Sequence, residues 1–143
     1  MVDDVVINKA AIIERCLARV HAEHGGDDRV LHENITKQDS IILNLQRACE
    51  AAIDLAMHLV AARRLGVPQE SREAFDLLVA GASLDAGLGE RLAGMVGFRN
   101  VAVHDYRTLD LAIVRSIIRD RLGDLSAFTH WTIARFGDPR EAL

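Results

Sequence analysis

Proline, glycine and aromatic residues are scarce in this chain of 143 residues. Two prolines and ten glycines provide too few turns for a domain built of many short strands. Apolar residues make up 50% of the sequence and charged residues 27%, which suits a single globular domain with one core. Alanine, leucine, isoleucine and arginine are abundant, and this composition favours helices.

The chain also lacks long apolar runs and paired cysteines. No uninterrupted apolar run approaches the roughly 18 residues that a membrane-spanning helix needs. The first residues, MVDDVVINKA, are acidic and unlike a secretion signal. Cys16 and Cys49 lie far apart, outside any metal-binding spacing. We therefore expect a cytoplasmic protein with two reduced core cysteines, no metal site and no contact with a membrane.

Acidic residues outnumber basic ones, 21 against 17, for a formal net charge of −4. This balance argues against a protein whose whole surface attracts phosphate. The charge is unevenly distributed, because residues 99–121 carry five basic and three acidic side chains, whereas residues 1–98 carry ten and fifteen. The one net-positive window starts at Arg99, so any nucleic-acid surface has to be local.

Apolar residues recur every three or four positions, and no stretch alternates as a strand would. This spacing predicts helices over about 5–20 and 38–65, separated by GGDDR at 25–29. The second of these should be the longest helix or nearly so. Ser71 and Asp85 are residue types that cap helices, and they predict the starts of a third and a fourth helix.

A fifth helix is expected to start near Thr108 or Asp110 and to continue past Ile133. The short connections between these segments are typical of antiparallel neighbours. The sequence thus predicts an all-α antiparallel bundle of about five helices over residues 1–136. The remaining residues, 137–143, are predicted to form a frayed tail.

The segment RNVAVHDY, residues 99–106, combines an arginine, a histidine and the only tyrosine of the chain. Arginine can hold a phosphate through two parallel hydrogen bonds, and histidine exchanges protons near neutral pH. Together they can cleave RNA without a metal ion. The 2′-hydroxyl loses its proton and attacks the adjacent phosphate, while arginine stabilises the added negative charge.

Helix geometry limits this interpretation. Five positions along an α-helix rotate a side chain by about 500°, so that Arg99 and His104 would point roughly 140° apart. Either the helix ends or distorts near His104, or arginine and histidine from two copies of the chain combine across a dimer axis. The competing interpretation is structural, with a buried histidine and a surface arginine that fix a helix end.

In this segment the sequence resembles the HEPN superfamily, whose signature is an arginine, four to six residues and a histidine, commonly with a polar residue after the arginine. Asn100 occupies the polar position. Arg99, His104 and Tyr106 match the narrower R-x4-H-x-Y motif of HepT-like toxins. The stretches GVPQESREAFDLLVAG, 66–81, and MVGFRNVAVHDY, 95–106, are also similar to that family.

The resemblance implies a HEPN-like fold, a homodimer with two motifs facing a shared cleft, and a metal-independent endoribonuclease without a cofactor. Arg99 and His104 would be catalytic, and Asn100 would orient either of them. The family's partner is a small MntA-like nucleotidyltransferase antitoxin that uses ATP to attach AMP to the motif tyrosine, here Tyr106. Negative phosphate at that position would repel an RNA substrate.

Three more arginines, Arg107, Arg115 and Arg119, are candidates for contacts with RNA. Arg115 and Arg119 are four residues apart and can share a helix face, although such a face is also typical of a simply solvated surface. Two other functions stay open. One is a non-catalytic subunit that binds nucleotide or substrate for a nucleotidyltransferase, and the other is a structural dimerising bundle.

Overall fold

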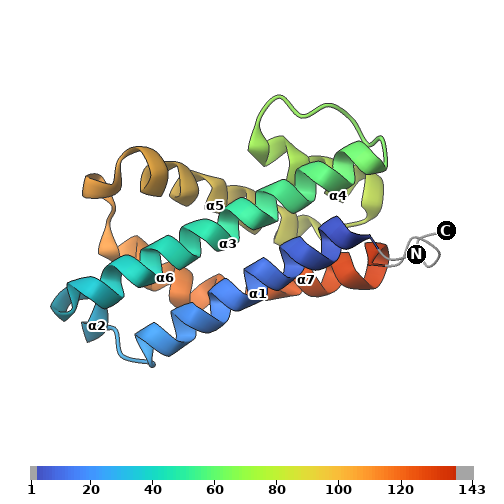
Figure 1. Cartoon of the computed structure of the whole chain (residues 1–143). Helices are drawn as coiled ribbons and strands as arrows, with labels where there is room; N and C mark the ends of the chain where they lie inside the picture. Colours follow the sequence, from blue (N-terminus) through green and yellow to red (C-terminus); the bar gives the residue numbers. More distant parts are fainter. Residues whose placement is uncertain (1–2, 138–143) are drawn as a thin grey trace.

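The computed structural model describes residues 3–137, and these residues form an all-helical bundle (Figure 1). Within that range the α-helices are α1 (Asp4–His24), α2 (Arg29–Glu33), α3 (Ile35–Ala62), α4 (Ser71–Ala82), α5 (Ala86–His104), α6 (Leu111–Asp120) and α7 (Leu122–Phe136), and a 3₁₀-helix, η1, spans Tyr106–Thr108. The predicted all-α fold is confirmed, with more helices than the five expected. Of the predicted frayed tail, residues 138–143 lie outside the described range.

The two long helices α1 and α3 lie side by side and form the main body of the bundle (Figure 1). Helix α1 begins where the carboxylate of Asp3 accepts hydrogen bonds from the N–H groups of Val5 and Val6, and it ends at Gly25 in the left-handed conformation, φ 61°. Helix α3 has 28 residues and is the longest, as predicted. The short helix α2 between them was not predicted from the sequence.

The core fills the space between α1, α3, α4, α5 and α7. Its aromatic part is a row in which the ring centroids of Phe75 and Phe128 lie 5.6 Å apart, those of Phe128 and Trp131 6.0 Å, and those of Trp131 and Phe136 5.3 Å. Cys16 and Cys49 are buried and free, as predicted. In residues 3–137 no helix is long and apolar enough to cross a membrane.

The single helix predicted from about residue 110 past Ile133 is wrong, because the chain turns at Arg121, φ −116° and ψ −14°, and divides it into α6 and α7. The predicted start is confirmed, since Asp110 caps α6 and accepts from the N–H of Ala112 at 2.8 Å. Helix α6 packs against α2, whereas α7 packs against α1, α3 and α5. The two halves face different partners, so a straight helix could not bury both apolar faces.

Helices α4 and α5 pack against each other and against α3. Asp85 caps α5 as predicted, its carboxylate accepting from the N–H of Leu88 at 2.9 Å. The approach of α4 to α5 is close at Gly89, where an added Cβ would lie 2.5 Å from Cγ2 of Val79. Helix α5 leads from this contact towards the end of the molecule where α3 begins (Figure 1).

Candidate functional site

The motif segment occupies the last turns of α5 and the 3₁₀-helix that follows it. Asp105 leaves the helical conformation, φ −149° and ψ 55°, and its N–H closes the last turn on the carbonyl of Val101 at 2.8 Å. The helix therefore ends at His104, but both Arg99 and His104 still lie within it, so the helix end does not by itself bring the two side chains together.

Arg99 points inward towards α4. Its Nη2 donates to Oγ of Ser71 over 3.5 Å, a long hydrogen bond, and its Nε is buried without a hydrogen-bond partner in the described part of the chain. Cys49 lies nearby on α3, and burial raises the pKa of its thiol to about 12, so it remains neutral and does not balance the charge of Arg99. Apart from the long contact with Ser71, the guanidinium makes no hydrogen bond to the described residues, so its N–H groups are not committed to the fold.

Ser71 does not cap α4 as the sequence predicted, because it is the first helical residue and Glu70 holds the capping position. The carboxylate of Glu73 instead accepts from the N–H of Gln69 at 2.9 Å, across the start of the helix. The prediction is wrong by one residue, and the consequence is specific. The hydroxyl of Ser71 is turned towards Arg99 and accepts from it.

His104 and Asn100 are exposed on the outer side of α5. Among the interactions recorded for residues 3–137, none joins the side chains of Arg99 and His104. One chain therefore brings the two motif residues to the same helix end without pairing them. This is the separation that helix geometry predicts for residues five positions apart.

Tyr106 starts η1, and its hydroxyl donates to Oδ1 of Asp39 on α3 over 2.5 Å. Burial and this hydrogen bond raise the pKa of Tyr106 to about 12. Tyr106 as a whole remains 42% exposed. Sequence reasoning missed Asp39, because 67 residues separate it from Tyr106 and nothing in the local pattern around α3 singles it out.

The other arginines proposed for RNA contacts differ in their freedom. Arg107 and Arg115 are exposed and make no hydrogen bond or ion pair within the described residues. Arg119 is held by its neighbour, since its Nε and Nη2 both donate to the carboxylate of Asp120 at 3.1 to 3.2 Å. Arg107 and Arg115 are therefore the better placed cations.

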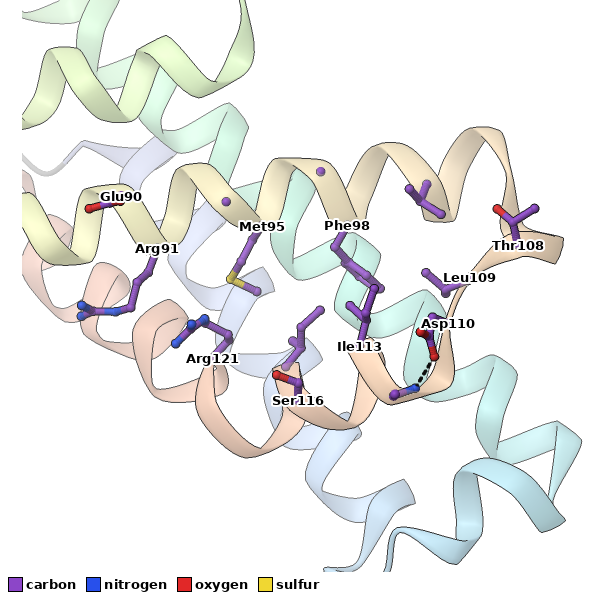
Figure 2. Close-up of a pocket in the computed structure, with 15 residues that line it drawn as sticks. Glu90, Arg91, Met95, Phe98, Thr108, Leu109, Asp110, Ile113, Ser116 and Arg121 are labelled. Atoms are coloured by element: carbon purple, nitrogen blue, oxygen red, sulfur yellow. Dashed lines mark hydrogen bonds between the residues drawn. The ribbon is translucent and has the colours of Figure 1, made fainter.

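A pocket of about 800 Å³ lies between α5 and α6 (Figure 2). Met95 and Phe98 point into it from α5 and Ile113 from α6, while Arg91 and Arg121 lie at one end and Thr108 at the other. None of the three motif residues lines it. The pocket is mainly apolar, and it adjoins the motif through Val101 and Thr108 on either side of the helix end.

Metal ligands are not gathered in this region. Over residues 3–137, no group of three or more histidine, cysteine, aspartate or glutamate side chains could hold a metal ion. The site's own chemistry consists of a half-buried guanidinium, an exposed imidazole and a phenol bound to a carboxylate. These groups can bind an anion and exchange protons.

Comparison with known proteins identifies the family of this chain. A family model described as "Ribonuclease HepT-like" matches residues 11–130. The chain belongs to the HepT-like ribonuclease family. It is 44% identical over 126 residues to the mRNA nuclease HepT of Shewanella oneidensis, covering 88% of this chain and 94% of the relative. The resemblance predicted from the motif is confirmed.

Two solved structures of toxin–antitoxin pairs have the same fold. One is the tri-AMPylated Shewanella oneidensis HEPN toxin in complex with MNT antitoxin, with a TM-score of 0.83 and 44% identity over 90% of this chain and 96% of that chain. The other is a toxin–antitoxin complex with AMP-PNP, with a TM-score of 0.84 and 43% identity over the same shares. The predicted HEPN-like fold is thereby confirmed.

Proposed function

We propose that this chain is the ribonuclease toxin of a HepT/MntA-type toxin–antitoxin pair and cleaves RNA internally, without a metal ion, at Arg99 and His104. The observation that carries the proposal is the buried, unpartnered Nε of Arg99 at the motif of a HepT-like ribonuclease. Buried polar groups in proteins nearly always have a partner. An arginine without partners for all its N–H groups, on the same motif as an exposed histidine, is suited to a phosphate oxygen.

The chemistry follows from these two side chains. His104 takes the proton of an RNA 2′-hydroxyl, whose oxygen then attacks the adjacent phosphorus. Arg99 donates N–H groups to the phosphate oxygens as negative charge builds on them. The bond to the 5′-oxygen breaks, that oxygen gains a proton, and a cyclic phosphate remains. Asn100, exposed beside Arg99, orients the phosphate or the imidazole.

A second copy of the chain completes this site, because Arg99 and His104 point apart within one copy. The apolar pocket between α5 and α6 is the surface we assign to that contact. Gly94 and Gly97 border it, and an added Cβ at either would meet no atom within 4 Å, which leaves room for another helix. Ile113 is 50% exposed in the same pocket.

The dimer is tested by charging that pocket. We expect Ile113→Glu to convert a dimer into a monomer in light scattering, because a carboxylate in the contact would be desolvated without a partner. Val67→Glu, at a residue 82% exposed and distant from the pocket, is the control and should leave the mass unchanged. A monomeric wild-type chain would contradict the proposed dimer.

Neutralisation is assigned to an MntA-like nucleotidyltransferase that attaches AMP from ATP to Tyr106. The tri-AMPylated relative and its complex with an antitoxin support this step. An added phosphate would place negative charge two residues from His104 and beside Arg107, where RNA phosphates are expected. Because Tyr106 is the only tyrosine, Tyr106→Phe should abolish the gain in mass.

The activity itself is tested with purified RNA in the presence of a chelator. We expect the wild-type chain to release cyclic-phosphate ends and Arg99→Ala and His104→Ala to release none, with Arg72→Ala on α4 as the matched exposed control. Cleavage that stops on chelation would contradict the metal-free mechanism. Intact RNA in every reaction, with retained binding to a nucleotidyltransferase, would instead favour the non-catalytic subunit.

A further inference from the structure

The hydroxyl of Tyr106 is held by a carboxylate from a distant part of the chain. Its partner Asp39 lies on the second turn of α3, and the Oη–Oδ1 distance is 2.5 Å. Distances of this kind are typical of a hydroxyl that donates to an ionised carboxylate. The contact links η1 to α3, and no backbone hydrogen bond joins these two elements within the described residues.

A phenol in this state is a weak nucleophile. The pKa of Tyr106, raised to about 12 by burial and by Asp39, keeps its proton in place near neutral pH. Asp39 is the charged side chain that acts on this pKa, while His104, Asp105 and Arg107 flank the tyrosine on its own segment. A proton acceptor already bonded to the reacting oxygen is what general-base catalysis requires.

We propose that Asp39 is the general base that activates Tyr106 for nucleotidyl transfer. The inference rests on the proposed modification of Tyr106 and adds the residue that enables it. As Oη of Tyr106 forms its bond to the α-phosphorus of a nucleoside triphosphate, its proton moves to Oδ1 of Asp39. The bond from the α-phosphorus to the bridging oxygen breaks, pyrophosphate leaves, and the protonated carboxyl then returns its proton to water.

Modification of Tyr106 also removes its hydrogen bond to Asp39. The product has no hydroxyl proton to donate, and its phosphodiester carries a negative charge next to the carboxylate of Asp39. The hydrogen bond between η1 and α3 is thus replaced by repulsion between like charges.

The experiment measures the initial rate of AMP incorporation by intact mass, with Mg-ATP and the MNT antitoxin of the Shewanella oneidensis pair. A partner-free arm replaces both with adenosine 5′-phosphorimidazolide, an activated AMP. We expect Asp39→Asn and Asp39→Ala to slow both reactions roughly 100-fold, the lower end of what a general base contributes. Asp76→Asn, an exposed aspartate on α4, is the matched control.

Asp39→Asn separates a base from a simple positioning role, because asparagine still offers an oxygen to the hydroxyl. If Asp39 only positions Tyr106, this variant keeps the wild-type rate, and the proposal is overturned. If Asp39 is the base, the rate of the variant rises about tenfold per pH unit between about pH 6 and 9, whereas that of the wild type stays level. Circular dichroism confirms that each variant is folded.

Failure of the underlying function gives a different result. A wild-type chain that gains no AMP in either arm, or gains it on a residue other than Tyr106, overturns the modification of Tyr106 itself. Modification of the wild type and of Asp39→Asn at equal rates leaves that modification standing and removes only the role of Asp39. Tyr106→Phe, which should gain no AMP, gives the background rate in both arms.

Discussion

Polar groups are satisfied differently in two regions of this bundle: a closed region, where α1 and α7 meet, and an open region at the motif. Where α1 and α7 meet, the carboxylate of Glu14 accepts from the hydroxyls of Ser126 and Thr129, so that a half-buried charge has its partners. At the end of α5, the buried Nε of Arg99 has none, and His104 is exposed. The first region stabilises the fold, whereas the second keeps hydrogen-bonding capacity for a ligand.

Apolar groups show the same division. The aromatic row around Phe128 is closed, and Phe128 itself is fully buried. Around the motif, Val101, Val103 and Ile113 are between 37% and 50% exposed. An exposed apolar patch next to unpaired polar groups is typical of a surface that another molecule covers.

Phe128→Ala is the substitution that should destabilise the closed region most. We expect the free energy of unfolding to fall by about 3–5 kcal/mol, because the change leaves a cavity between Phe75 and Trp131. Urea unfolding followed by circular dichroism measures the loss. His130→Ala, an exposed neighbour on α7, should stay within about 0.5 kcal/mol of wild type. A similar loss in both variants would contradict the contrast.

In the open region, Arg99→Met should reduce RNA cleavage without reducing the free energy of unfolding. We expect RNA cleavage to drop at least about 100-fold, or about 2.7 kcal/mol of transition-state stabilisation. The free energy of unfolding should hold or rise, because methionine fills the space without a buried unpaired donor. Parallel cleavage and urea-unfolding measurements check both. A large loss of stability would show that Arg99 supports the fold.

In the closed region, the contribution of Asp3 to stability should depend on pH. Burial opposes ionisation of this carboxyl, but hydrogen bonds from His58 and from the N–H groups of Val6 and Val5 outweigh it and lower its pKa. A lowered pKa means that the stabilisation is present above the ordinary value of 3.8 and is lost as the pH falls through the folded value. Asp3→Ala should cost about 1 kcal/mol at neutral pH, as a lost helix cap does.

The check on Asp3 is thermal unfolding of both proteins at neutral and acidic pH. The difference between wild type and Asp3→Ala should shrink in acid, where the wild-type carboxyl also loses its charge. Asp76 on α4 is exposed and makes no hydrogen bond within the described residues. The difference in stability between wild type and Asp76→Ala should therefore not change with pH. A difference that grows in acid would reverse the assigned sign.

The smallest effect concerns the titration of Tyr106. Its single-tyrosine absorbance should change near pH 12 in the folded wild type, and in Asp39→Ala the pKa should move down towards the ordinary 10.0. Since the folded pKa is raised, the associated stabilisation is present below the ordinary value and is lost as the pH rises through about 12. Identical titrations would contradict the hydrogen bond to Asp39.

Much of the fold was predictable because helix starts and apolar spacing are local. Asp85 and Asp110 cap the helices that their positions predicted, and the longest helix is where its spacing placed it. The break at Arg121 was not predictable, since Ile118, Leu122 and Leu125 continue the spacing of four and three across it. Only the different packing partners of α6 and α7 require the turn.

The site divides in the same way. Arg99, His104 and Tyr106 are recognisable because they lie within eight residues, and their chemical types already indicate phosphate binding and proton transfer. Asp39 and Ser71 were not recognisable as members of the site, because their contacts with it span 67 and 28 residues of sequence. Such pairs form only when helices from separate parts of the chain pack together.

The helical class, the family and the motif could be identified from residue types at short spacing. The packing of distant helices was needed to turn Arg99 inward with an unpartnered Nε and to bring Tyr106 to Asp39. Periodicity reports which face of a helix is buried, whereas the partner of that face depends on how all the helices close around one core.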